Sequence, residues 1–495
     1  MATLTKPQSG ARRLSVPTRL FYGFGSVAFG VKDNGFSYFL LIFYNQVIGL
    51  PAVTVGLAIM VALVVDAFLD PIVGQISDNW RSKWGRRHPF MYAAALPVAV
   101  SYLLLWNPPR GWSHEALFFY LIGVAVLIRS FITFYEIPSS ALAAELSTDY
   151  DERTRLLSYR YLFGWIGGLT MYFAALRVFL TPNAAHATGQ LNPEGYAHYG
   201  LAAALLMLVA ILVSAAGTHR EIPHLREAPR RKATMAILVR EMVGTMAHPS
   251  FLVILVASIF NAMALGLGFA INLYFQTFFW ELPADQIANF TFSSLAAALF
   301  AFATAPWISK RFGKKRAAMT LILVSLVLTV APIVLRLVEF FPANGSAWVF
   351  PLLLVQNTIA LGFGIIGQIM FSSMIADVTE DSELRTGRRQ EGLFFAAAAF
   401  VAKAVTGLGI FVSGLMLAVV HFPEGAKPGQ VAPEVVRNLG LVYVPSLVVL
   451  YGLAVLVLSG YRISRASHEE SLRKLAAAAD LVAEGEPASQ MGKLL

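Results

Sequence analysis

Twelve apolar runs divide this sequence, and they restrict its fold more than any other feature. Each run has roughly 17 to 30 residues, enough for an α-helix to cross a hydrocarbon core. The runs lack the alternating pattern of transmembrane barrel strands. We therefore predict an all-α polytopic membrane protein. Its twelve transmembrane helices are expected near residues 20–48, 54–77, 89–107, 115–145, 157–181, 198–217, 250–280, 287–308, 317–338, 347–376, 393–421 and 438–461.

Composition supports this interpretation and removes several functional classes. Only 14% of the residues are charged, against about 25% in a soluble domain. The chain has no cysteine, which excludes disulfides and thiolate metal sites. We expect no cofactor and no cleavable signal, because residues 1–15 are polar and basic and the first apolar run is too long for a signal peptide.

The net charge of +9 reflects topology, not a nucleic-acid partner. With the N-terminus in the cytoplasm, most of the 38 lysines and arginines fall in cytoplasmic segments. This positive-inside pattern predicts that both termini are cytoplasmic. The predicted location is the plasma membrane, or the inner membrane of a bacterium. The opposite side holds only Arg110, Arg177, Arg336, Lys427 and Arg437.

An internal repeat divides the chain into two similar halves. Residues 144–154 (AELSTDYDERT) resemble residues 376–386 (ADVTEDSELRT) at a shift of 232, and WGRR at 84–87 resembles FGKK at 312–315 at a shift of 228. We place both pairs in short cytoplasmic loops. Two parallel six-helix repeats indicate a secondary transporter with its site between them. The expected parts are an N-terminus (1–19), two bundles (20–217 and 250–461), a central loop (218–249) and a tail (462–495).

Eight ionisable residues lie inside the predicted spans, where each costs about 2.5–3.5 kcal/mol unless it faces a cavity or a partner. Asp66 and Asp70 are one helical turn apart, so both carboxylates share one face. If both were ionised, their repulsion would be about 3 kcal/mol at an effective dielectric of 20. A bound cation or a proton would relieve it, and Pro71 frees one backbone carbonyl nearby. The other six are Lys32, Asp33, Arg129, Glu136, Arg160 and Lys403.

Structural ion pairs are the alternative reading of these charges. Asp66 and Asp70 could pair with Arg160, Lys403 or Lys32. On the fourth span, Arg129, Thr133 and Glu136 share one face; they form either a salt bridge that neutralises Glu136 or a site for cation and solute. Lys403 could neutralise an acid of the other half and couple site occupancy to motion.

Four motifs resemble the glycoside–pentoside–hexuronide:cation symporters, a branch of the major facilitator superfamily. They are YGFG (22–25), DAFLDPIVGQISDNWRSKWGRRHPF (66–90), YEIPSSALAAELSTDYDERTRLLSYR (135–160) and ADVTEDSELRTGRRQEG (376–392). The resemblance implies a cation site at Asp66, Asp70 and Thr133. It implies substrate binding by Glu136 and Arg160, with Lys403 connecting the two sites. It also implies a cytoplasmic gate, for which the candidate residues are Asp78, Arg81, Gly85, Arg86, Arg87, Glu145, Asp377 and Arg388.

Three positions depart from the family pattern. The acid of the first helix that binds sugar hydroxyls would fall at Gly30, and Asp33, one turn later, is our substitute for it. The aromatic residue that stacks on the sugar ring is Ser140 here. An asparagine that helps to bind sodium is Leu69. We also place Arg129 with the substrate-binding residues, on the face that carries Glu136.

The expected function is symport of a small polar solute, a sugar or glycoside, with Na⁺ or H⁺ by alternating access, carried out by a monomer. The same mechanism with an amphipathic or lysolipid-like cargo is the alternative. A membrane-embedded enzyme is not expected, because the chain has no HExxH, GxSxG or P-loop motif. A non-transporting sensor would need a signalling appendage, for which only the tail is available.

Overall fold

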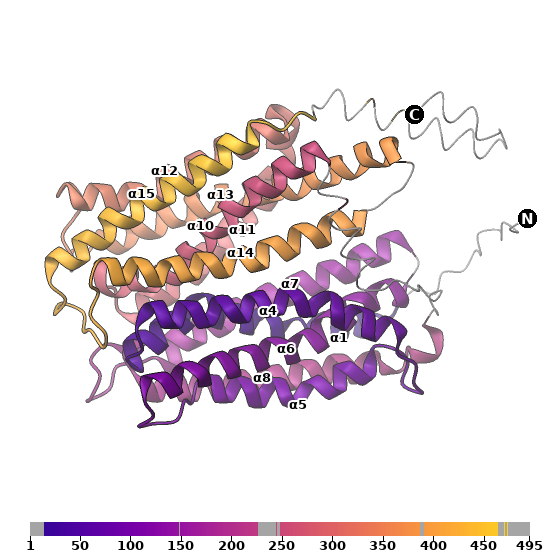
Figure 1. Ribbon diagram of the computed structural model, residues 1–495, viewed down its shortest axis with the longest axis horizontal. Helices are drawn as coiled ribbons and strands as arrows, with labels where there is room; N and C mark the ends of the chain where they lie inside the picture. Colours follow the sequence, from indigo (N-terminus) through magenta and orange to yellow (C-terminus); the bar gives the residue numbers. More distant parts are fainter. Residues whose placement is uncertain are drawn as a thin grey trace, which may run out of the picture. The chain divides into compact units, whose positions relative to one another are not determined.

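The computed structural model describes residues 14–147, 149–225, 248–386 and 391–463, and three single residues at 244, 470 and 473. These residues form helices joined by short loops, without a β-strand among them (Figure 1). The first half contains α1 (Val16–Phe24), α2 (Val27–Asn34), η1 (Gly35–Phe39), α3 (Leu40–Ile42), η2 (Phe43–Val47), α4 (Ala52–Asn79), α5 (His88–Leu105), α6 (His114–Leu146), α7 (Tyr150–Ala174), η3 (Ala175–Phe179), η4 (Gly189–Leu191), α8 (Pro193–His219) and η5 (Ile222–His224). The second half contains α10 (Pro249–Tyr274), η6 (Phe275–Phe279), α11 (Ala284–Phe312), α12 (Lys314–Leu337), α13 (Val349–Thr386), α14 (Glu391–Val419) and α15 (Pro433–Leu458).

The predicted twelve spans are confirmed. Eleven helices of the described residues are long and apolar enough to cross a membrane. The remaining span is the first one, which runs from Val16 to Val47 as five consecutive helical segments. Two of these, η1 and η2, are π-helical, and such wider turns are often found at functional sites.

One loop expectation was wrong. Residues 376–386 were predicted to lie in a cytoplasmic loop, but α13 continues as a helix through Thr386. The apolar run ends near residue 376, and the polar residues that follow extend the helix beyond it. In the first half, the matching residues do contain a break, since α6 ends at Leu146 and α7 begins at Tyr150.

The chain forms two compact units. The first unit contains residues 1–232, 267–291 and 410–432, and the second contains residues 233–266, 292–409 and 433–495. The first unit therefore holds six spans of the first half together with the ends of α10, α11 and α14. Most of the predicted central loop and tail, and residues 1–13, lie outside the described residues.

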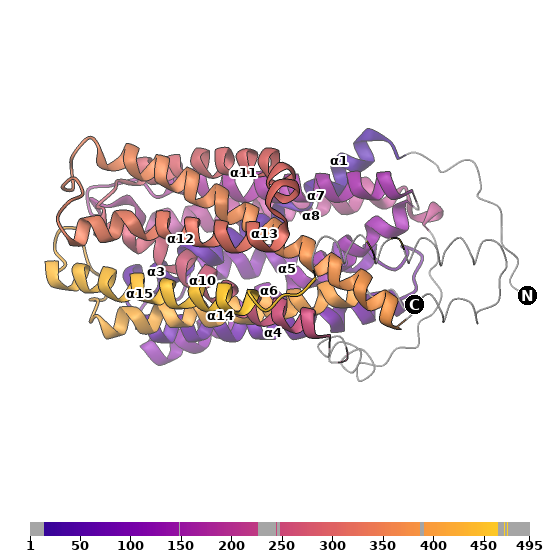
Figure 2. The same ribbon diagram turned by 90° about the horizontal axis from the view of Figure 1, so that it is seen from above.

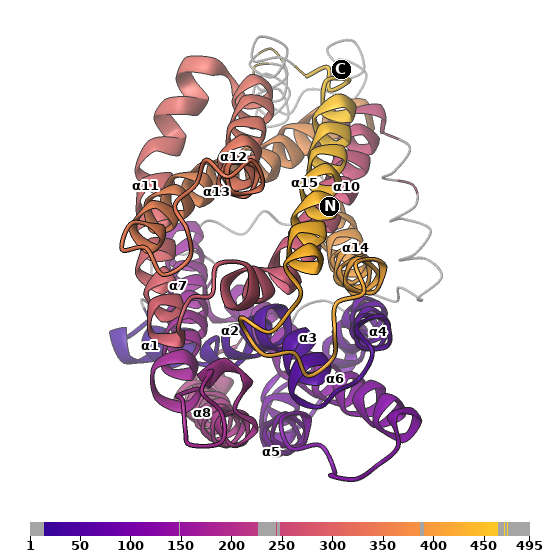
Figure 3. The same cartoon turned by 90° about the vertical axis from the view of Figure 1, so that its left-hand side faces the viewer.

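The first unit is built from pairs of helices in contact. Helix α6 packs against α4 and α5, α5 against α8, and α7 against α1 and α2 (Figure 3). Aromatic side chains fill the unit at the end of the helices away from the termini. Trp106 stacks on Tyr196, and Phe39 stacks on Tyr172. These buried rings hold the first span against the third, fifth and sixth.

The second unit has its own apolar core. Helix α12 packs against α13 and α15 (Figure 2). Buried side chains from six spans meet there, including Phe251, Ala301, Ile322, Met374, Phe394 and Leu458. Lys403 lies in this unit, in α14, and is half-buried.

Candidate functional site

Two acids of α4 converge on one hydroxyl group of α6. Asp66 is 1% exposed and accepts a hydrogen bond of 2.8 Å from Thr133 Oγ1. The same hydroxyl lies 3.4 Å from Asp70 Oδ1. Helices α4 and α6 pack along each other, so the i, i+4 spacing of the acids places both carboxyl groups against the α6 face that carries Thr133. The structure thus brings together the three residues expected to form the cation site.

Arg129 joins this group through a buried ion pair. Its Nη1 donates to Asp66 Oδ2 at 2.7 Å, and both side chains are 5% exposed or less. The guanidinium lies 4.6 Å from the centroid of the Phe36 ring. Its positive charge offsets one of the two carboxylates, which reduces the repulsion between Asp66 and Asp70. The sequence predicts Arg129 as a substrate-binding residue, and the structure places its guanidinium on Asp66.

The sequence contained a signal for this pairing. Arg129 and Thr133 are four residues apart and share one face of α6, so a face that presents Thr133 to Asp66 also presents Arg129. The sequence also allows ion pairs of the two acids with Arg160, Lys403 or Lys32. The structure shows an ion pair between Asp66 and Arg129.

Arg160 contacts α6 about one turn or more beyond Thr133, at Glu136 and Ser139. This α7 residue donates to Ser139 Oγ at 2.9 Å and to the Glu136 carbonyl oxygen at 3.2 Å. Its guanidinium lies 5.1 Å from the centroid of the Phe29 ring. Arg160 thereby places charge beside Glu136 and joins α2, α6 and α7. Glu136 itself is half-buried.

Asp33 has an exposed carboxyl group that is tied to a buried lysine. The Asp33 side chain is 54% exposed, and its Oδ1 lies 2.7 Å from Lys32 Nζ. The Lys32 side chain is only 3% exposed. In this ion pair the lysine is buried and the carboxyl group of Asp33 is accessible at the surface of the first span.

Position 30 has no room for a side chain. A Cβ atom at Gly30 would lie 2.0 Å from the Gly164 carbonyl oxygen of α7. Gly168 is also close, since a Cβ atom there would lie 2.8 Å from the Gly30 carbonyl oxygen. The first span and α7 thus cross at glycines, and the acid that the family pattern places at position 30 cannot occupy it in this packing.

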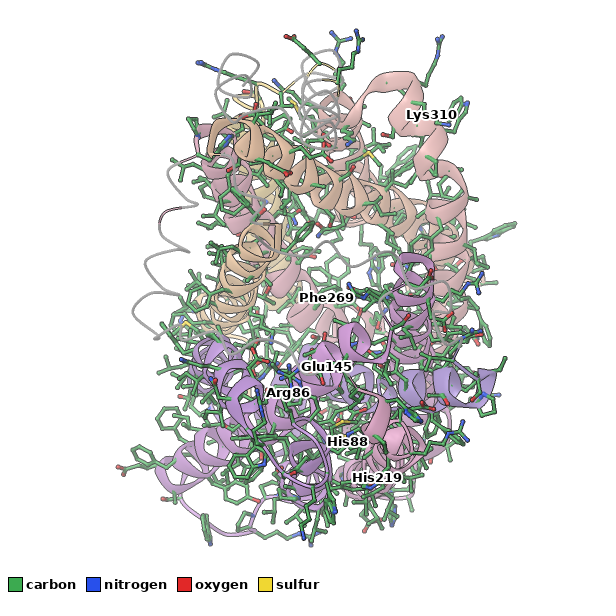
Figure 4. All side chains as sticks on the ribbon, turned by 90° about the vertical axis from the view of Figure 1, so that its right-hand side faces the viewer. Arg86, His88, Glu145, His219, Phe269 and Lys310 are labelled. Atoms are coloured by element: carbon green, nitrogen blue, oxygen red, sulfur yellow. The ribbon has the colours of Figure 1, made fainter. Side chains whose placement is uncertain are left out.

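A charged network surrounds the loop between α4 and α5. Glu145, near the end of α6, accepts from Arg86 at 2.7 Å and from Arg87 at 2.8 Å (Figure 4). Arg87 also pairs with Asp78 and donates to Ser77 Oγ at 2.7 Å. Positive charges at the C-terminal end of α6 are further favoured by its dipole.

The remaining loop residues fix the shape of this turn. Arg81 donates to the carbonyl oxygens of Asp78 and Trp80 at 2.9 and 2.8 Å. Gly85 has φ of +74°, which glycine adopts without strain. The structure thus gathers the gate residues expected for the first half into one network. Arg388 lies outside the described residues.

The chain matches the family described as MFS/sugar transport protein over residues 21–465. It belongs to this family. The resemblance to the cation symporter branch of the major facilitator superfamily is thereby confirmed, and the chain is a multi-pass membrane transporter, not an enzyme.

Curated relatives of this family member align with nearly its whole length. An uncharacterised symporter of Synechocystis (sll1374) is 26% identical, with 94% of this chain and 98% of the relative covered. The isoprimeverose transporter of Lactiplantibacillus pentosus is 25% identical over 93% and 92%. The mouse sphingosine-1-phosphate transporter MFSD2B is 26% identical over 90% and 89%.

Solved structures agree on the fold of this transporter. The nucleoside transporter NupG is 14% identical and superposes with a TM-score of 0.61, with 90% of this chain and all of NupG covered. A D-xylose–proton symporter gives a TM-score of 0.59 at 14% identity, with 88% and 96% covered. At this level of identity, the likeness establishes the major facilitator fold alone.

The second half of the transporter repeats one contact of the loop network. Lys314, at the start of α12, pairs with Asp377 of α13. At the shifts of 228 and 232, these residues correspond to Arg86 and Glu145, which form an ion pair in the first half. The repeat seen in the sequence is therefore also a repeat of an ion pair.

Proposed function

We propose that this protein is a symporter that couples Na⁺ or H⁺ to the transport of a small polar solute, a sugar or glycoside, by alternating access. The observation that carries the proposal is the convergence of Asp66, Asp70 and Thr133 between α4 and α6. Two carboxyl groups one turn apart on α4 and a hydroxyl group of α6 supply the oxygen atoms that a hard monovalent cation prefers. A sugar cargo is supported by the family's description as sugar transport proteins and by the relative named isoprimeverose transporter.

The coupling follows from shared occupancy. A cation at Asp66 and Asp70 reduces the negative charge of α4, and a solute at Asp33, Glu136 and Arg160 draws on the adjoining faces of α2, α6 and α7. Each ligand then raises the affinity of the other by the same factor. Arg160 would link the cation site to the solute site, because it donates a hydrogen bond to the α6 backbone one turn beyond Thr133. Lys403 is our candidate for the link to the second half.

The loop network is the proposed cytoplasmic gate. The pairs of Glu145 with Arg86 and Arg87 lie within the first half, and the pair of Lys314 with Asp377 lies within the second. Each would hold together the cytoplasmic helix ends of its own half, which meet or part as the two halves rock. This assignment takes the predicted orientation, with both termini in the cytoplasm, and an inner or plasma membrane location.

Asp70→Asn tests the coupling. Gradient-driven solute uptake into proteoliposomes is expected to fall about 100-fold, because the amide carries no charge for a cation to neutralise. Solute exchange without a gradient is expected to continue, since Asp70 makes no proposed contact with the solute. The control is Asp285→Asn, which removes an exposed carboxylate of α11. Gradient-driven uptake at the normal rate in Asp70→Asn would show that the pair does not couple transport.

Arg129→Gln tests how the ion is chosen. The guanidinium on Asp66 repels a second cation, and two unit charges about 6 Å apart at an effective dielectric of 20 repel by about 3 kcal/mol. The variant is therefore expected to bind Na⁺ about 100-fold more tightly. The midpoint of sodium-dependent thermal stabilisation of purified protein measures this change. Equal midpoints in the variant and the unaltered protein would contradict the assigned role of Arg129.

A lysolipid-like cargo is the second candidate. It is favoured by the relationship to the mouse sphingosine-1-phosphate transporter and by Ser140, which replaces the aromatic residue that would stack on a sugar ring. Competition between labelled sugars and lysolipids for uptake into proteoliposomes separates the two cargo classes.

A further inference from the structure

The internal repeat continues at the end of the spans away from the termini. Leu50-Pro51-Ala52 recurs as Leu282-Pro283-Ala284, again at a shift of 232. The π-helical segments η2 and η6 that precede these tripeptides occupy matching positions and have the same length. Their closing hydrogen bonds also match, since Leu50 N donates to Tyr44 O and Leu282 N donates to Gln276 O, at 2.9 and 2.8 Å.

A buried glutamine holds the end of the seventh span. Gln190, in the loop between the fifth and sixth spans, is 1% exposed. Its Nε2 donates to Thr277 Oγ1 at 3.2 Å and to the Leu282 carbonyl oxygen at 3.1 Å. Gln190 is itself positioned by Tyr196, whose hydroxyl donates to its carbonyl oxygen at 2.9 Å. The first half of the chain thus binds the second half here.

A second buried glutamine makes the reciprocal connection. Gln46, at the end of the first span, is 4% exposed. Its Nε2 donates to the Pro423 carbonyl oxygen at 3.1 Å, and its Oε1 accepts from Ala426 N at 2.8 Å. Both partners lie in the loop between the eleventh and twelfth spans. This loop is the repeat counterpart of the loop that carries Gln190, because a shift of 232 takes residue 190 to residue 422.

Asn45 ties this second connection to the seventh span. Its Oδ1 accepts from Gln46 Nε2 at 2.6 Å and from the Tyr274 hydroxyl at 2.8 Å. Its Nδ2 donates to the Leu50 carbonyl oxygen at 2.7 Å, which is the counterpart of the carbonyl that Gln190 holds. Phe422 closes the group by packing on the rings of Tyr274 and Phe278. All of these residues lie in the first compact unit.

We propose that these contacts form a reversible lock, which closes the transport path at the end of the helices away from the termini and opens once in each transport cycle. We call the group of Asn45, Gln46, Gln190, Tyr274 and Thr277 the distal lock. The contacts join the two six-helix halves, so the halves cannot separate at this end while the contacts persist. They are hydrogen bonds between neutral groups, which water replaces at modest net cost when the lock opens. The role of the lock rests on the proposed transport function, but its opening does not depend on which ion or solute is carried.

A cysteine reporter can measure this opening, since the chain contains no cysteine of its own. Ser37 lies one turn beyond Asp33 toward the lock and is half-buried. Ser37→Cys would be labelled with a membrane-impermeant maleimide in sealed vesicles of both orientations. Protease sensitivity of a C-terminal tag identifies the side of the membrane that the reagent reaches.

Gln46→Ala and Gln190→Ala together are expected to raise the labelling rate from the side opposite the termini by about tenfold or more, because the loss of several hydrogen bonds favours the open state. The matched control is Gln286→Ala, a half-buried glutamine of α11 at the same end of the molecule. It is expected to leave the rate unchanged.

Each single variant removes the contacts of one of the two glutamines. It is expected to raise the labelling rate of Ser37→Cys from the side opposite the termini by about threefold. The single variants decide the question if the double variant does not yield folded protein. Labelling at the unaltered rate in folded Gln46→Ala and Gln190→Ala would overturn the proposal. The labelling measurement needs no solute or ion gradient. An unchanged labelling rate would therefore reject the lock without rejecting the coupling role of Asp70, and normal uptake in Asp70→Asn would reject the coupling role without rejecting the lock.

Discussion

Asp66→Ala is expected to lower the free energy of unfolding by about 3–5 kcal/mol, because it leaves the Arg129 guanidinium buried without its carboxylate. Removing one member of a buried ion pair costs far more than the pair contributes, since the remaining charge cannot recover its hydration. Arg129 Nε is already buried without a hydrogen-bond partner among the described residues. Equilibrium unfolding of the purified protein in detergent measures the change.

Two controls separate burial of charge from loss of a contact. The double variant Asp66→Asn with Arg129→Gln replaces the ion pair by neutral groups of similar size, and most of the lost stability is expected to return. Asp285→Asn breaks an exposed ion pair with Arg177, whose partners are both more than half exposed, and its expected cost is below about 1 kcal/mol. A change as small as that in Asp66→Ala would mean that Arg129 does not depend on Asp66.

The sequence was sufficient to predict the spans, because transmembrane helices depend on length and apolarity that can be read directly from the chain. The irregular turns within these helices and the exact helix ends were harder to predict from the sequence. The π-helical turns of the first span contain no proline. The extension of α13 to Thr386 was missed because its last turns are polar, and polar residues in a helix beyond the apolar run resemble those in a loop.

The sequence predicted which residues form the candidate site better than it predicted which of them contact one another. The spacing of Asp66 and Asp70 placed them on one face, and the structure brings Thr133 to both. The pairing of Arg129 with Asp66 follows from the spacing of Arg129 and Thr133 once Thr133 is known to face Asp66. That Thr133 faces Asp66 depends on how α6 is rotated against α4, which no spacing within one helix determines. The repeat shift could have predicted the ion pair of Lys314 and Asp377 once that of Arg86 and Glu145 was known.

The crossing of the first span with α7 explains the departure at position 30. Backbone atoms approach closely there because Gly30, Gly164 and Gly168 carry no side chains, and membrane helices use small residues at such crossings. A side chain at position 30 would require the helices to separate along their length. Asp33 lies one turn later in the first span, and its carboxyl group is exposed.

Gly30→Ala is therefore expected to lower the free energy of unfolding by about 3 kcal/mol, because its Cβ would lie 2.0 Å from the Gly164 carbonyl oxygen, which is backbone and cannot rotate away. Gly30→Asp adds a larger and charged group, so we expect it to abolish the folded protein and not to restore a sugar-binding acid. Thermal unfolding and the yield of monodisperse protein measure both effects. Gly123→Ala in α6 is the matched control, since its Cβ would meet nothing within 4 Å and the higher helix propensity of alanine is expected to add up to about 1 kcal/mol of stability. A folded Gly30→Asp protein that binds a sugar more tightly than the unaltered protein would instead show that α7 can move away, and that the position of the acid is a matter of ligand choice and not of packing.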